Sequence, residues 1–77
     1  MVQKELLIRL GKVIAIFRKE KKLSQALLAD KVGCTRESLS EIENGKRNFS
    51  VKKLGKIAKK LNRQISDLFK TAEELIL

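Results

Sequence analysis

The side chains whose types and spacing could do chemistry lie together in one short stretch: Arg36, Glu37, Ser38, Ser40 and Glu41. A guanidinium can donate two hydrogen bonds to O6 and N7 of guanine, a carboxylate can accept from N4 of cytosine, and a hydroxyl can serve a base or a phosphate. Catalysis fits poorly, because the chain contains no histidine and so lacks the commonest catalytic base and ligand for zinc or haem. These residue types therefore suit recognition of base edges, such as those of double-stranded DNA, better than catalysis, and we predict no enzyme activity, no metal and no cofactor.

These side chains need a rigid element to present them, and residues 24–45 are typical of two short helices joined by a tight turn. Ser24 and Thr35 are good N-caps, because a hydroxyl oxygen accepts from an unpaired N–H of the first helical turn. Gly33 and Gly45 are good stops, because glycine adopts the left-handed conformation without a steric penalty. The apolar residues expected to face inward are Leu27, Leu28, Val32, Leu39 and Ile42. Two helices joined by a glycine-containing turn of about three to four residues indicate a helix-turn-helix, whose second helix enters the DNA major groove.

Three further helices are expected around this unit. The first spans residues 4–21, and its helical spacing gives an inward apolar stripe of Leu6, Leu10, Val13, Ile14 and Phe17. The next is capped by Ser50 and runs to about Leu61, with Val51, Leu54, Ile57, Ala58 and Leu61 facing inward. The last is capped by Ser66 and runs from Asp67 to near Ile76, with one face formed by Leu68, Phe69, Ala72, Leu75 and Ile76. The sequence therefore predicts an all-α fold in a single domain, residues 1–77.

The formal net charge of +9 points to nucleic acid or another anionic surface as the partner. Residues 44–66 contain no acid but eight lysines and arginines. Two of them, Lys52 and Lys53, lie in the first turn of an expected helix, where the helix dipole disfavours cations. A phosphate bound at that helix end would explain them, because it can accept from backbone N–H groups and pair with the lysines. The alternatives are that these lysines are merely tolerated and that the net charge serves solubility.

Cys34 is the only cysteine, so no intrachain disulfide can form, and this fits a reducing cytosol. We expect its thiol to be half-buried in the turn. No window of the sequence is long and apolar enough to span a bilayer, and the N-terminus begins with a charged amphipathic segment rather than a signal peptide. The predicted location is the cytoplasm, away from any membrane.

Short motifs from about residue 9 to residue 70 resemble, in order and spacing, the Cro/cI-type (XRE, lambda-repressor-like) helix-turn-helix domains. The pieces that match are Leu10-Gly11-Lys12, Arg18-Lys19-Glu20-Lys21, Leu23-Ser24-Gln25, Leu28-Ala29, Val32-Gly33, Ile42-Glu43-Asn44-Gly45-Lys46-Arg47-Asn48, Ile57-Ala58 and Asp67-Leu68-Phe69. The resemblance implies a five-helix, lambda-repressor-like DNA-binding domain that binds a (pseudo)palindromic operator as a homodimer and regulates transcription. The chain length is similar to that of the controller proteins of restriction–modification systems and of other compact repressors, so a controller or an autorepressor is implied.

The resemblance also assigns roles to residues. It implies that Gln25 holds a phosphate and braces the second helix of the helix-turn-helix, and that Arg18 and Glu43 form a partly buried ion pair. The physics agrees for the pair, because neither charge could stay unpaired at a packed junction. The residues expected to contact the DNA backbone, from the resemblance and the charge pattern together, are Gln25, Thr35, Lys46, Arg47, Asn48, Ser50, Lys52 and Lys53.

The sequence departs from the family pattern at several positions. Lys22 stands where the family usually has glycine at a left-handed helix end, which should cost roughly 1 kcal/mol. Phe49 replaces a common proline, and we expect it to pack on the fourth helix. The two acids in the base-reading stretch, Glu37 and Glu41, should repel phosphates, so non-specific affinity should be low and sequence selection stringent.

The C-terminal helix, about residues 66–76, leaves apolar side chains that a small core cannot readily cover and that would promote association if exposed. We predict a two-fold homodimer built from this helix and the end of the preceding one. The expected interface residues are Leu61, Ile65, Leu68, Phe69, Ala72, Leu75 and Ile76. Such a dimer would place two recognition helices about 34 Å apart, which is one turn of DNA.

A second class of function remains open, in which the chain is an antitoxin or another regulator that binds a protein partner. Its apolar edges would then be Ile8, Ile16 and the C-terminal tail. A helix lying on a membrane surface is disfavoured, because the basic residues do not form one continuous amphipathic face. The sequence leaves open the operator, the sign of regulation and any effector.

Overall fold

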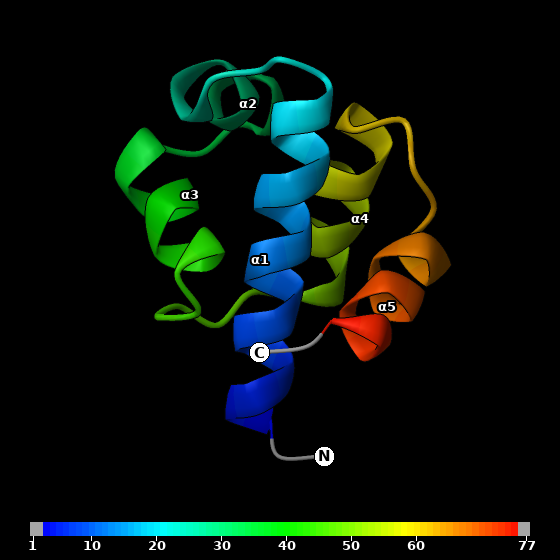
Figure 1. The fold of residues 1–77 in the computed structure, drawn as a ribbon. Coiled ribbons are helices and arrows are strands. Elements are labelled where there is room, and N and C mark those ends of the chain that lie inside the picture. The colour runs from blue at the N-terminus through cyan, green and yellow to red at the C-terminus, as the bar shows by residue number, and fades with distance from the viewer. Residues whose placement is uncertain (1–2, 76–77) are drawn as a thin grey trace.

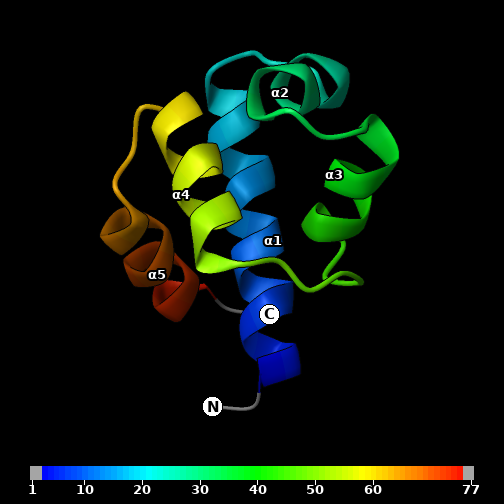
Figure 2. The same cartoon turned by 180° about the vertical axis from the view of Figure 1, so that it is seen from behind.

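The structure is a computed structural model that describes residues 3–75, and the regular elements in that range are all helices. They are α1 (Gln3–Glu20), α2 (Gln25–Val32), α3 (Arg36–Glu43), α4 (Val51–Lys60) and α5 (Ile65–Glu74). In Figure 1, α1 occupies the middle of the molecule, with α3 on one side and α4 and α5 on the other. Figure 2 shows the same arrangement from behind, with α2 lying across the end of α1. The predicted all-α class and the order of five helices are confirmed.

No helix between residues 3 and 75 has both the length and the apolar composition that crossing a membrane requires.

The core is formed where the inner faces of the helices meet around α1. The stripe predicted for α1 is confirmed, since Leu10, Val13, Ile14 and Phe17 are buried and Leu6 packs against them. Two apolar residues expected in the core are instead exposed: Leu27 by 45% and Val51 by 74%. The reason in α2 is that the inward face is taken by Leu28, Ala29 and Val32, and one step along a helix turns a side chain by about 100°. In α4, Val51 precedes the first buried position, Leu54.

Hydroxyl side chains begin three of the helices, as the sequence predicts. The Oγ atoms of Ser24, Thr35 and Ser50 each accept from the backbone N–H three residues later at 3.0 Å. The prediction for α5 is wrong, because Gln64 rather than Ser66 is the N-cap. Asp67 Oδ2 accepts from the Gln64 N–H at 2.9 Å, and Ile65 packs against the core. The helix thus begins early enough to bring Ile65 inward.

Four helices end in the same way, with one residue in the left-handed conformation. In each case the N–H of the following residue donates to a carbonyl five residues earlier, which is the Schellman motif. The left-handed residues are Lys22 (φ 59°), Gly33 (φ 87°), Gly45 (φ 70°) and Asn62 (φ 58°). Lys22 therefore adopts the strained conformation predicted for it, and Asn62 ends α4 where the helix was expected to end, at about Leu61.

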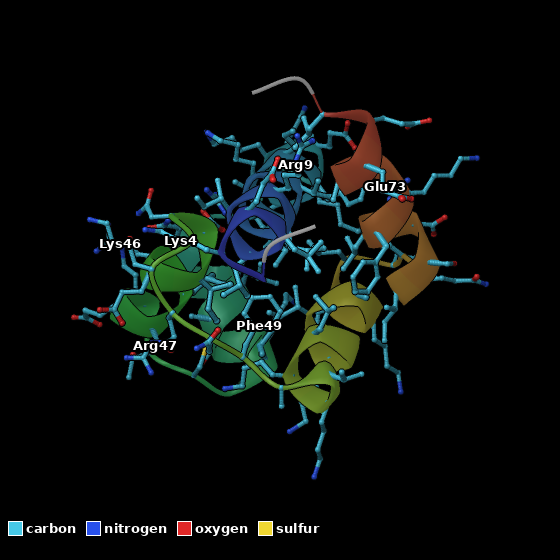
Figure 3. All side chains as sticks on the ribbon, turned by 90° about the horizontal axis from the view of Figure 1, so that it is seen from below. Lys4, Arg9, Lys46, Arg47, Phe49 and Glu73 are labelled. Atoms are coloured by element: carbon cyan, nitrogen blue, oxygen red, sulfur yellow. The ribbon has the colours of Figure 1, made fainter. Side chains whose placement is uncertain are left out.

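Two arginines tie the C-terminal part of the fold to α1. Arg9 donates from Nη1 to the carbonyl oxygens of Leu75 at 2.6 Å and Ala72 at 3.2 Å, so it satisfies carbonyls at the end of α5. Figure 3 shows Arg9 on α1 near this end of α5. Arg63 lies 4.2 Å above the centroid of the Phe17 ring and pairs with Glu20 at 3.1 Å. Both contacts hold the α4–α5 unit against α1.

Gly11 allows α1 and α3 to approach each other closely. A Cβ atom at this position would overlap the carbonyl oxygen of Ile42 and would lie 2.7 Å from that of Glu43. Both obstacles are backbone atoms, so neither can rotate away. Gly55 in α4 is different, because the nearest atom to a Cβ there would be Ile65 Cδ1 at 3.5 Å, an ordinary contact.

These two helical glycines predict opposite effects of the same substitution. Gly11→Ala should lower the free energy of unfolding by about 1–3 kcal/mol, the usual cost of overpacking. Gly55→Ala should raise it by about 0.5–1 kcal/mol, because alanine loses less backbone entropy in a helix. Urea denaturation followed by circular dichroism measures both. A Gly11→Ala variant as stable as the wild type, or more stable, would contradict the close approach of α1 and α3.

Candidate nucleic-acid interface

The polar face of α3 is turned outward along its whole length. Leu39 and Ile42 are buried on the inner side of the helix. The five residues predicted to reach base edges lie outside this core face, with Arg36, Glu37 and Glu41 exposed and Ser38 and Ser40 half-buried. Figure 2 shows α3 at the edge of the molecule, away from α4 and α5. The helix can therefore enter a groove of DNA without unfolding any part of the core.

A buried ion pair fixes the orientation of α3. Arg18 on α1 donates from Nε to Glu43 Oε2 at 2.7 Å and from Nη2 to Glu43 Oε1 at 3.1 Å. Arg18 also donates from Nη1 to the Leu23 carbonyl at 2.7 Å, and Gln25 donates from Nε2 to Glu43 Oε1 at 2.9 Å. The predicted pair thus forms, and the predicted brace from Gln25 to α3 forms through the same carboxylate. Each buried charge is satisfied by its partner, which is the condition for stable burial.

The hydroxyl groups of Thr35 and Ser50 cap helices as acceptors, and within residues 3–75 neither O–H donates a hydrogen bond. Thr35 Oγ1 and Ser50 Oγ act as acceptors toward backbone N–H groups, each at 3.0 Å. A hydroxyl has one donor in addition to its acceptor lone pairs. Both groups can therefore donate to a further acceptor while they cap α3 and α4, and their contact with the DNA backbone stays a prediction.

The loop between α3 and α4 presents basic and polar side chains on a fixed support. Lys46, Arg47 and Asn48 are exposed, while Phe49 packs against the hydrophobic core and anchors the loop. In Figure 3, Lys46 and Arg47 extend outward beside α3, and Phe49 lies between the loop and the interior. In the first turn of α4, Lys52 is exposed and Lys53 half-buried, and that turn carries no acid. Lys46, Arg47 and Asn48 thus follow α3 directly, whereas Lys52 and Lys53 lie at the start of α4, where the loop ends.

An ion pair between two predicted DNA-contacting residues was not foreseen from the sequence. Arg47 on the loop donates from Nε to Glu41 Oε1 at 2.8 Å, and its Nη2 lies 2.7 Å from the same oxygen. The two side chains are 51% and 48% exposed. The residues lie six apart, so the pair depends on how the chain reverses after α3 rather than on helical spacing.

Sequence reasoning also missed polar residues that border the site. Lys12 and Lys19 of α1 line a groove together with Gln25 and Asn44. Asn44 donates from Nδ2 to the Ser40 carbonyl at 2.9 Å, so it closes the end of the recognition helix. The signal for the lysines was their spacing of seven residues, which places both on one side of a helix.

Part of the predicted dimer surface is wrong. Leu61, Leu68 and Ala72 are buried in the core of a single chain, so they have no area left to offer a second copy. Their inward position follows from the packing of α5 against both α1 and α4. Phe69 is 36% exposed and Ile65 and Leu75 are half-buried, whereas Ile76 lies outside the described residues.

A family model described as helix-turn-helix matches residues 14–68. This chain belongs to the Cro/cI-type helix-turn-helix family. The control protein C.MunI from a Mycoplasma species is 43% identical over 68 residues, which cover 87% of this chain and 92% of that protein.

Solved structures give the same result for the fold. The restriction–modification controller protein C.AhdI from Aeromonas hydrophila is 32% identical with a TM-score of 0.78, over 80% of this chain and 94% of its own. The clp gene regulator ClgR from Corynebacterium glutamicum is 26% identical with a TM-score of 0.88, over 90% of this chain and 73% of its own. The matched region of the family model spans α3, the following loop and α4, so it contains the recognition helix and the basic loop.

The buried pair predicts a large loss of stability when one partner is removed. Glu43→Ala should lower the free energy of unfolding by about 3–5 kcal/mol, because it leaves the Arg18 guanidinium buried without its counter-charge. The double variant Arg18→Met with Glu43→Leu should be more stable than Glu43→Ala alone, because no buried charge remains. Chemical denaturation of the three proteins checks this order. If the single variant were the more stable one, the pair could not be the constraint described here.

Proposed function

We propose that this chain is a sequence-specific DNA-binding transcriptional regulator that inserts α3 into the major groove. The observation that carries the proposal is the buried Arg18–Glu43 pair, which holds α3 with its polar face outward at a bidentate geometry of 2.7 and 3.1 Å. A helix held in this way presents Arg36 and Glu37 near its N-terminal end, where recognition helices reach base edges. Arg36 is suited to guanine and Glu37 to cytosine.

The surroundings of α3 suit the sugar-phosphate backbone. The acid-free stretch from residue 44 to residue 66 begins directly after the helix, and its first part lies on the exposed loop and the first turn of α4. Contacts to phosphates fix the register of a protein on DNA, while contacts to bases give specificity. In this proposal Lys46, Asn48 and Lys52 position the domain, and Gln25 and Thr35 contact the backbone at the helix N-termini.

The similarity to a control protein and to a restriction–modification controller protein supports a role as a controller or autorepressor. We propose that the regulator acts in the cytoplasm, without a cofactor and without catalysis. An alternative is a regulator that also binds a protein partner, and the observation that favours it is the exposure of Ile16 by 39% and of Leu27 by 45%. Co-purification of a neighbouring gene product would support this alternative.

A homodimer is part of the proposal, because two recognition helices about 34 Å apart would read two half-sites in successive turns of DNA. The surface that remains available for it on α5 comprises Ile65, Phe69 and Leu75. Phe69 is the largest of these side chains, and α5 lies on the opposite side of α1 from α3, so pairing through α5 would leave both recognition helices free.

Base reading by Arg36 is tested by selection of a binding site from random duplexes. Arg36→Ala should relax the preference at one base-pair position, with a loss of about 1–3 kcal/mol for the preferred base. Lys56→Ala is the matched control, because it removes one charge from an exposed position outside the proposed contacts. Uniform weakening by Arg36→Ala, with every base preference unchanged, would make Arg36 a phosphate contact.

Dimerisation is tested by sedimentation at micromolar concentration. The wild-type chain should sediment as a dimer, and Phe69→Glu should shift it to the monomer, because a carboxylate would be desolvated in an apolar interface. Leu27→Glu is the control, since Leu27 is a comparably exposed apolar residue on α2. A wild-type chain that sediments only as a monomer would contradict the proposed interface.

A further inference from the structure

We infer that Glu41 is a positioning residue that holds Arg47 for a phosphate contact, and that it does not itself read a base. The inference rests on the proposed function, because it concerns how one surface works on DNA. It also reverses one role suggested by the sequence, where Glu41 counts among the base-reading residues and Arg47 stands independently of it.

The backbone after α3 brings the two residues together. The N–H of Lys46 donates to the Glu41 carbonyl at 2.9 Å, and the N–H of Gly45 donates to the Ile42 carbonyl at 3.1 Å. Gly45 has a φ of 70°, and a Cβ atom there would lie 2.7 Å from Ile8 Cγ1 on α1. The reversal is therefore fixed by both conformation and space. It returns the chain along α3 so that Arg47 starts next to an amide already bound to the backbone of Glu41.

The side chains then form an ion pair that leaves donors free. Arg47 uses Nε and Nη2 on a single carboxylate oxygen, at 2.8 and 2.7 Å. Within residues 3–75 its Nη1 group has no hydrogen-bond partner. A guanidinium carries five N–H donors in a rigid planar fork. Because Nε and Nη2 are held by Glu41, the orientation of Nη1 is also fixed, and this group can donate to a phosphate oxygen.

The place of Glu41 in α3 argues against base reading. Glu41 is the sixth of the eight residues in α3, and base contacts come mainly from the N-terminal residues of a recognition helix. The pull of Arg47 directs the carboxylate toward the loop. The pair as a unit carries no net charge, so Glu41 can approach the backbone without the repulsion that an isolated carboxylate would meet.

A purely electrostatic role and a positioning role of Glu41 predict opposite changes in DNA affinity when its carboxylate is removed. If the carboxylate only repels phosphates, Glu41→Ala should strengthen DNA binding. If it orients Arg47, Glu41→Ala should weaken binding, by roughly threefold for a half-exposed pair. The second effect requires Arg47, so in an Arg47→Ala background the same substitution should leave binding unchanged or strengthen it. A double-mutant cycle isolates this coupling.

The experiment measures dissociation constants for a selected site and for a random duplex over a range of salt concentrations. We expect Glu41→Ala to weaken binding to both duplexes. The affinity of Glu41→Gln should fall between those of the wild type and Glu41→Ala, because an amide oxygen can still accept from Arg47. Arg47→Ala should reduce the salt slope by about 0.9, as expected for one lost phosphate contact. Glu37→Ala is the control. Its carboxylate makes no ion pair within residues 3–75, so its removal should strengthen binding to the random duplex.

Each remaining outcome decides the question. The positioning role would be overturned if Glu41→Ala strengthened DNA binding both in the wild-type chain and in the Arg47→Ala variant. It would also be overturned if Glu41→Ala relaxed the preference at one base pair whether or not Arg47 is present. In either case the wild-type chain would still bind DNA. Absence of salt-dependent DNA binding by the folded wild-type chain would overturn the proposed function itself. Thermal unfolding by circular dichroism verifies that every variant is folded, which the half-exposure of both side chains leads us to expect.

Discussion

The ion pair between Arg18 and Glu43 is the contact on which the rest of the structure depends. It joins α1 to the end of α3, and through Gln25 and the Leu23 carbonyl it also fixes the start of α2. A buried pair gains little over an apolar contact of the same size, but it requires an exact match of donors and acceptors. That requirement allows one rotation of α3 about its axis. The rotation places Leu39 and Ile42 inside and leaves the polar residues of the helix to solvent, so a constraint inside the domain determines which side chains can meet DNA.

Two glycines allow the close packing between α1 and α3 that the Arg18–Glu43 pair requires. Gly11 lets the backbone of α3 lie directly on α1, next to Glu43, while Gly45 reverses the chain against Ile8. An ion pair of fixed length would strain the domain if the helices stood farther apart. The glycines and the buried pair therefore act together. The glycines set the distance between α1 and α3, and the Arg18–Glu43 pair sets the rotation of α3 about its axis.

Features that depend on local chemistry were predictable from the sequence, and features that depend on the course of the chain were not. The hydroxyl caps at Ser24, Thr35 and Ser50 and the stops at Gly33 and Gly45 follow from side-chain chemistry within one turn. The buried pair was predictable through the family resemblance. The start of α5 was mispredicted, because the packing of Ile65 outweighs the preference of Ser66 for a cap. Leu61, Leu68 and Ala72 were assigned to a dimer because an amphipathic face looks the same whether its own chain or another covers it.

The Glu41–Arg47 pair shows why residue types alone overstate the acidity of the recognition helix. By composition α3 carries three carboxylates and one guanidinium. Glu43 is buried and neutralised by Arg18, and Glu41 is paired with Arg47, so Glu37 is the acid that faces solvent without an ion-pair partner in the described part of the chain. The charge presented at the surface therefore differs from the charge that the sequence implies. It is close to zero along α3 and positive beyond the helix. In the proposed function, a nearly neutral α3 beside a basic loop separates the two tasks of a DNA-binding domain. The loop would attract any phosphate backbone, and the helix would add affinity only where its hydrogen bonds match the bases.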